Sequence, residues 1–174
     1  MAKDNSYLVF VVDDDTKVLT MSKHYIEKNS AYEVEVLTFV SGEEALAKID
    51  MKPDIVVLDY LFDAEDSEAM NGLQVQERII QASPETEVII ISGQDNMEVA
   101  LETIRKGAFD YIIKGENAIT RAQLAAEKIL QAKNREFVLH QNNKNLRIVV
   151  VIMALFIIGL VAFVIYATSG GFSS

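Results

Sequence analysis

DIVVLDY, residues 54–60, is a short apolar run that ends on a carboxylate, and three other runs in the chain have the same form. Short runs of β-branched and aliphatic residues, separated by segments of helical period, are typical of the buried parallel strands of an α/β sheet. Ligands bind beyond the carboxyl ends of such strands. We therefore expect one crevice to collect the groups that follow the four runs: the acidic pair Asp13 and Asp14 after residues 9–12, Asp59 after 55–58, Ser92 after 88–91 and Lys114 after 111–113.

Together these groups suit the binding of a metal ion and a phosphoryl group. Carboxylates that lie together repel one another and stay ionised together only around a cation, and a site lined with oxygen atoms suits Mg²⁺. Asp59 can then act as a nucleophile toward phosphorus, because the metal, the Lys114 ammonium and the Ser92 hydroxyl can neutralise and orient phosphoryl oxygens. The residues alone therefore predict a site that holds an aspartyl phosphate.

The rest of the pattern alternates strands with helices. Right-handed crossovers between parallel strands make this an α/β fold with a doubly wound, five-stranded parallel sheet. Asp15 stands just before the first expected helix, where a carboxylate can cap the free N–H groups. Strands are expected near residues 7–12, 33–39, 54–58, 87–91 and 109–113, and helices near 16–29, 42–50, 71–82, 95–106 and from 118 onward.

Between residues 6 and 132 the chain resembles the receiver domain of two-component response regulators. The matching segments are VVDDD at 11–15, DIVVLDY at 54–60, MNGLQV at 70–75, VIIISG at 88–93 and ALETIRKGAFDYIIKG at 100–115. Each segment alone is a weak signal, but five in this order and at this spacing form a strong one. The resemblance implies a flavodoxin-like sheet of strand order 2-1-3-4-5.

The resemblance also implies a phosphoacceptor and a metal site. Asp59 corresponds to the phosphoacceptor. Asp14 and Asp59 are expected to bind Mg²⁺ directly, Asp13 to bind it through water, and the backbone carbonyl of Leu61 to be a further ligand. The phosphodonor is expected to be a phosphohistidine on a histidine kinase or a phosphotransfer protein.

Three further residues match the family's phosphoryl-binding and switching positions. Ser92 and Lys114 correspond to the hydroxyl and the lysine that bind the phosphoryl group, and Tyr111 corresponds to the aromatic switch residue. We expect phosphorylation to change the binding of a partner protein. The chain is then a switch and not an enzyme, apart from self-catalysed phosphorylation and dephosphorylation.

Three departures from the family pattern bear on this interpretation. Lys114 is followed by Gly115 instead of proline, and a cis bond before a non-proline residue costs roughly 2.5 to 4 kcal/mol, so we expect a trans peptide. The loop at residues 62–70 is long and acidic and lacks the usual proline. Leu61 is apolar and cannot orient a hydrolytic water, a role for which Gln94 is the candidate.

A second large feature is the apolar segment IVVVIMALFIIGLVAFVIYA, which begins at Ile148 and ends at Ala167. It contains no charge and no proline, and at about 1.5 Å per residue it spans roughly 30 Å, the thickness of a bilayer core. Basic residues precede it and none follow, which places the receiver on the cytoplasmic side of a bacterial-type inner membrane. The expected organisation is a receiver at 1–132, a helical stalk at 133–147, a transmembrane helix at 148–167 and an external tail at 168–174.

Composition limits the other functions open to the chain. Its 174 residues include no cysteine, which excludes disulfide frameworks and cysteine metal sites. The formal net charge of −10 belongs wholly to residues 1–147, because no charged residue follows Arg147. Such an acidic body repels nucleic acid, so we expect no nucleic-acid partner. The expected partners are the phosphodonor, a protein target at the membrane and the lipid bilayer.

Two alternatives from other functional classes remain open. Asp13, Ser92 and Lys114 could imitate the nucleophile, hydroxyl and lysine of a haloacid-dehalogenase-type phosphatase. Lys17 stands where that family has threonine or valine, however, and the final acidic motif is missing. The second alternative is a membrane-bound scaffold of receiver form that binds partners without phosphorylation, which the Gly115 substitution and the altered loop keep open.

Overall fold

The computed structural model describes residues 6–61, 70–93 and 96–168. The chain divides into two compact units, Met1–Gln131 and Ala132–Ser174. The strands are β1 (Ser6–Val12), β2 (Glu33–Phe39), β3 (Ile55–Asp59), β4 (Glu87–Ser92) and β5 (Asp110–Ile113). The helices are α1 (Thr16–Asn29), α2 (Gly42–Leu46), the 3₁₀ turn η1 (Ile49–Met51), α3 (Gly72–Ala82), α4 (Met97–Arg105) and α5 (Ala118–Thr168).

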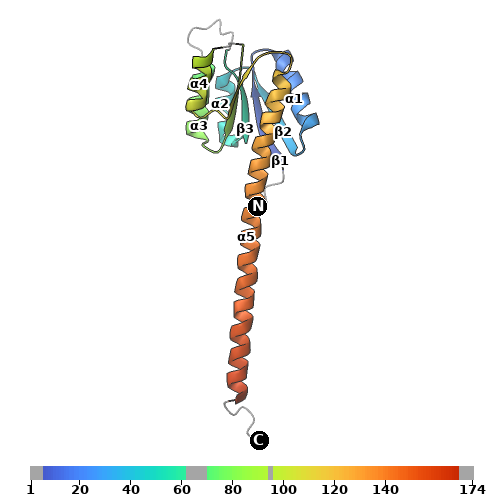
Figure 1. Cartoon of the computed structure of the whole chain (residues 1–174), viewed down its shortest axis with the longest axis vertical. Coiled ribbons are helices and arrows are strands. Elements are labelled where there is room, and N and C mark those ends of the chain that lie inside the picture. Colours follow the sequence, from blue (N-terminus) through green and yellow to red (C-terminus); the bar gives the residue numbers. More distant parts are fainter. Residues whose placement is uncertain (1–5, 62–69, 94–95, 169–174) are drawn as a thin grey trace. The chain divides into compact units, whose positions relative to one another are not determined.

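The first unit is a five-stranded parallel sheet of order β2-β1-β3-β4-β5 with helices on both faces (Figure 1). Alternate residues of each central strand face opposite sides. Val9 and Val11 of β1 pack with α1 and the first part of α5, whereas Phe10 and Val12 pack with α2 and α3. Because both faces are covered, the central strands are almost wholly apolar. The predicted fold class and strand order are confirmed.

Side-chain caps explain where the helices begin. The carboxylate of Asp15 accepts the backbone N–H of Lys17 at the start of α1, as expected. At the start of α3, Asn71 and Gln74 form a reciprocal capping box, with N–O distances of 3.0 Å in both directions. These capping side chains fix the residues at which α1 and α3 begin.

One predicted element differs from the structure. The helix expected at residues 42–50 is two shorter pieces, α2 and η1, and the second piece ends at Lys52 with a φ of 54°. Pro53 explains the ending, because the residue before a proline is disfavoured in the helical region. The apolar pattern of residues 42–50 did not reveal the break.

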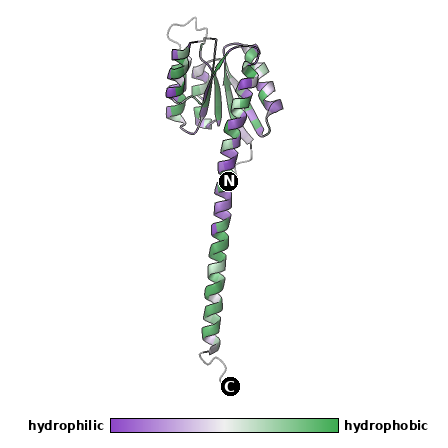
Figure 2. Cartoon of the chain, viewed as in Figure 1, coloured by the Kyte–Doolittle hydropathy of each residue, from purple (hydrophilic) through white to green (hydrophobic). Residues whose placement is uncertain are grey.

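The second unit contains the remainder of α5. Its residues from 135 to 168 are exposed, and the stretch from 148 to 167 is almost entirely apolar (Figure 2). Among the described residues, α5 is the one helix that is long and apolar enough to cross a membrane. An exposed apolar surface of this size is unfavourable in water.

The close approach of α3 to the end of β3 generates a test of the fold. A Cβ atom added to Gly72 would lie 2.6 Å from Tyr60 Cα and 2.8 Å from Asp59 O, which are backbone atoms that cannot move aside cheaply. We expect Gly72→Ala to lower the free energy of unfolding by about 1–3 kcal/mol, measured by chemical unfolding. Gly93→Ala is the matched control, because no atom lies within 4 Å of its added Cβ. Equal stability of the two variants would contradict the packing described here.

Candidate phosphoacceptor site

The carboxyl ends of four strands meet at one edge of the sheet. The register pairs Val12 with Leu58, Asp59 with Ile91 and Ser92 with Ile113, so these strand ends lie level with one another. The backbone N–H of Lys114 donates to Ser92 O at 2.7 Å and thereby fixes the residue just after β5. Register alone therefore places the predicted site residues side by side.

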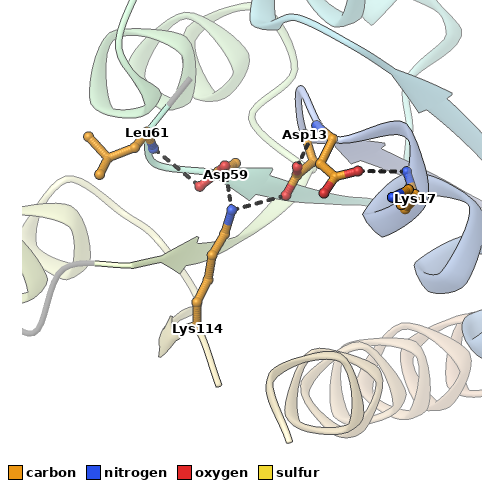
Figure 3. A network of polar contacts seen from close by, with 6 residues as sticks. Asp13, Lys17, Asp59, Leu61 and Lys114 are labelled. Atoms are coloured by element: carbon orange, nitrogen blue, oxygen red, sulfur yellow. Dashed lines mark hydrogen bonds and ion pairs between the residues drawn. The ribbon is translucent and has the colours of Figure 1, made fainter. Parts of the chain in front are cut away.

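Lys114 links two buried carboxylates across this edge. Its Nζ donates to Asp59 Oδ2 at 2.7 Å and to Asp13 Oδ2 at 3.3 Å (Figure 3). Asp59 is 2% exposed and Asp13 is 4% exposed. A pair of buried negative charges is strongly unfavourable without a counter-charge, and the ammonium of Lys114 supplies one.

The second oxygen of each carboxylate is held by a backbone N–H group. Leu61 N donates to Asp59 Oδ1 at 3.2 Å, and Asp15 N donates to Asp13 Oδ1 at 2.9 Å. In Figure 3 the two carboxylates lie on either side of the Lys114 ammonium. Both side chains are therefore oriented by the turns that follow their own strands.

The electrostatic setting raises the basicity of the phosphoacceptor candidate. Burial raises the pKa of Asp59 from 3.8 to about 6; the hydrogen bond and charge of Lys114 oppose this shift, and the charge of Asp13 adds to it. For Lys114, burial lowers the pKa, but the hydrogen bond to Asp59 and the two carboxylate charges outweigh burial and raise it overall. At neutral pH the site therefore holds an ionised carboxylate beside an ammonium.

The donor set fits a hard divalent cation. One carboxylate oxygen from each of Asp13, Asp14 and Asp59 can be chosen so that all three lie within 4.8 Å of one another. Asp14 is exposed, so the group is open to solvent on one side. Oxygen ligands and a high negative charge are what Mg²⁺ prefers in proteins. Asp13, Asp14 and Asp59 would therefore hold the ion.

The other predicted site residues have different surroundings. Ser92 is fully buried at the end of β4, and Tyr111 is half-buried in β5, where it lines a cavity beside α4. The side chain of Leu61 is 44% exposed, while its backbone contacts Asp59. Gln94 and residues 62–69 of the acidic loop lie outside the described residues. The peptide bond between Lys114 and Gly115 is trans, as expected.

Sequence reasoning missed a buried polar contact between α3 and α4. Gln76 of α3 is fully buried and donates to the backbone oxygen of Thr103 in α4 at 2.9 Å. Gln76 follows Val75 in an amphipathic helix, where a polar residue normally faces water. Its position three residues before the buried Ile79 was the available signal, because residues three apart share a helix face.

The raised pKa of Asp59 makes stability depend on pH. The folded state holds this proton more tightly than the unfolded state, so the free energy of unfolding falls as pH rises from about 4 to about 6. Without divalent cation at neutral pH, Asp59→Asn should unfold with a free energy about 1–3 kcal/mol higher than the natural chain. The difference should fall to nearly zero below about pH 3, where Asp59 is protonated in both the folded and the unfolded state.

Unfolding curves with and without Mg²⁺ measure this effect. Adding Mg²⁺ should stabilise the natural chain more than the variant, since the asparagine side chain of the variant offers the ion no charge. Asp54→Asn is the control, because Asp54 is also buried but accepts the Leu8 N–H at the other end of β3. A variant at Asp59 that is less stable than the natural chain at neutral pH would contradict the electrostatic description.

Comparison with known proteins identifies the family. The model of the response regulator receiver domain matches residues 9–126. The chemotaxis protein CheY of Listeria monocytogenes is 36% identical over 107 residues, covering 61% of this chain and 84% of that protein. The protein-glutamate methylesterase/protein-glutamine glutaminase of Thermotoga maritima is 32% identical over 140 residues, which are 75% of this chain but only 38% of that protein.

A solved structure agrees with these sequence matches. The CheY-like response regulator receiver domain protein of Methanospirillum hungatei superposes with a TM-score of 0.60 at 25% identity, over 74% of this chain and 98% of that one. The similarity therefore covers nearly the whole of that protein. The chain belongs to the response regulator receiver domain family of two-component systems.

Proposed function

We propose that this chain is a membrane-anchored receiver that accepts a phosphoryl group on Asp59. The donor is a phosphohistidine on a histidine kinase or a phosphotransfer protein, and the phosphorylated receiver changes its binding to a protein target at the membrane. One observation carries the proposal: the Lys114 ammonium lies between two buried carboxylates, Asp59 and Asp13, at the open edge of the sheet.

The geometry supports phosphoryl transfer in the following way. An oxygen of Asp59 forms the bond to phosphorus while the bond from phosphorus to the donor's imidazole nitrogen breaks, and the imidazole leaves. The Lys114 ammonium contacts the Asp59 carboxylate and is close enough to pair with a phosphoryl oxygen once Asp59 is phosphorylated. Ser92 provides a hydroxyl at the end of the neighbouring strand. Mg²⁺ held by Asp13, Asp14 and Asp59 would neutralise the charge on the phosphoryl oxygens.

The pKa of Asp59 suits this role. A carboxylate whose pKa is raised to about 6 is more basic than an ordinary aspartate, yet it is still ionised at neutral pH. The Leu61 N–H holds one oxygen in place, and the backbone carbonyl of Leu61 is proposed as a further ligand of the ion. Tyr111, which lines the cavity beside α4, is proposed as the switch residue.

The membrane anchor is the second part of the proposal. Residues 148–167 form a fully exposed apolar helix, and a bilayer is the environment in which such a helix is stable. The stalk, residues 133–147, carries Lys133, Arg135, Lys144 and Arg147, which favour the cytoplasmic side of an inner membrane. We therefore place the receiver, residues 1–132, in the cytoplasm and residues 168–174 outside.

Direct phosphorylation tests the first part. The full chain in detergent micelles, incubated with Mg²⁺ and acetyl phosphate, should gain one phosphoryl group by intact mass. The gain should disappear in Asp59→Asn or when Mg²⁺ is removed by a chelator, and it should persist in Asp54→Asn. If the natural chain gains nothing while Mg²⁺ still stabilises it, a scaffold that works without phosphorylation replaces the proposal.

Membrane fractionation tests the second part. The full chain should stay in the membrane pellet through high salt and alkaline washing, because about twenty buried apolar residues hold it independently of charge. A chain that ends at Arg147 should be released into the soluble fraction. Release of the full chain by salt alone would show that the apolar helix binds a protein or another copy of the chain.

A further inference from the structure

Helix α4 is packed loosely against the sheet. Of its nine residues only Thr103 is buried, whereas Met97 is 73% exposed and Leu101 is 48% exposed. Beside it lies a cavity of about 320 Å³, lined by residues of α4 and by Tyr111 of β5. Close packing normally fixes a helix in one position, and α4 has only one fully buried side chain to fix it.

The C-terminal end of α4 is tied to α3 by two polar contacts. The amide Nε2 of Gln76 donates to Thr103 O at 2.9 Å, and both residues are fully buried. On the adjoining surface, Lys106 Nζ lies 2.5 Å from Glu77 Oε1 and 3.4 Å from Glu102 Oε1. We name the pairs Gln76–Thr103 and Glu77–Lys106 the α3–α4 clasp.

Stability alone does not explain a glutamine at position 76. The Oε1 atom of Gln76 is buried and has no hydrogen-bond partner among the described residues. A buried acceptor without a partner is unfavourable, whereas an apolar side chain of the same length carries no such penalty. Gln76 therefore makes the hydrogen bond to Thr103 O while its buried Oε1 lowers the stability of the fold.

The other end of α4 is connected to the phosphoacceptor site. In the sequence, a short connection joins Ser92, at the site, to Met97, the first residue of α4. The backbone N–H of Lys114 donates a hydrogen bond to Ser92 O. Lys114 directly follows β5, and Tyr111 of that strand lines the cavity beside α4. A ligand that displaces Lys114 can therefore act on α4 through β5, because Tyr111 and residues of α4 line the same cavity.

We propose that the α3–α4 clasp holds α4 in its resting position and thereby limits how tightly the Asp59 site binds a phosphoryl group. The inference rests on the proposed function. If the ligand favours another position of α4, linkage requires that any contact specific to the resting position weakens ligand binding. Gln76 and Lys106 are positioning residues in this account, because neither contacts the site itself.

The test uses beryllofluoride, a phosphoryl mimic, titrated with Mg²⁺ into the full chain in detergent micelles and followed by ¹⁹F NMR. Gln76→Met removes the buried hydrogen bond and keeps the side-chain length. We expect about 3- to 10-fold tighter binding, the change that the loss of one hydrogen bond predicts. Amide exchange should become faster across α4 while the melting temperature stays unchanged or rises.

Two further variants separate the clasp from general packing. Gln123→Met is the matched control: Gln123 is also buried, and its Nε2 donates to Asn29 O at 3.0 Å, but this contact joins α5 to α1. Its beryllofluoride affinity should equal that of the natural chain. Lys106→Ala removes only the surface pair, so it should shift the affinity in the same direction by a smaller factor.

The following results would overturn the proposal that the α3–α4 clasp restrains α4. If the natural chain binds beryllofluoride and Gln76→Met binds it equally or more weakly, the clasp does not restrain α4. The same conclusion follows if Gln123→Met gains as much affinity as Gln76→Met. Should Gln76→Met fail to fold, Lys106→Ala decides alone, and unchanged affinity there overturns the inference. If the natural chain binds no beryllofluoride with Mg²⁺ present, the proposed function itself is wrong.

Discussion

The hydrogen-bonded ion pair between Lys114 and Asp59 is the contact on which the rest of the site depends. It places an ammonium 2.7 Å from a carboxylate that is almost fully buried, with Asp13 as a second acceptor at 3.3 Å. Removing Lys114 would leave two buried carboxylates, Asp59 and Asp13, without a counter-charge, which is strongly unfavourable. The site is therefore stable only while some cation, ammonium or metal, remains among the carboxylates.

The need for a positive charge beside Asp59 connects the site to the rest of the receiver. A group that draws the Lys114 ammonium away from Asp59 must itself carry negative charge. It also acts on β5, because Lys114 directly follows that strand, and Tyr111 of β5 borders the cavity beside α4. The sheet is rigid at this edge, since its strands are paired and the central ones are buried, but α4 keeps only one buried residue. A change in charge at the edge can therefore reach α4 through Tyr111 of β5.

The sequence predicted the parts that depend on local pattern. The runs that end at Asp13, Asp59, Ser92 and Lys114 became parallel strands whose ends meet, because register and strand order follow from apolar pattern and handed crossovers. It could not predict contacts that depend on how one helix packs on another. The apolar pattern did not reveal the break in the helix at residues 42–50, and the hydrogen bond from Gln76 to Thr103 O depends on how α3 packs on α4.

The central claim is that Asp59, and no other carboxylate of the acidic group, carries the phosphoryl group. Borohydride reduces an aspartyl phosphate to homoserine, so reduction of the phosphorylated full chain followed by peptide mass mapping identifies the modified position directly. The account predicts homoserine at position 59 and unmodified aspartate at position 13. Homoserine at position 13 would contradict it and would favour a phosphatase in which Asp13 is the nucleophile.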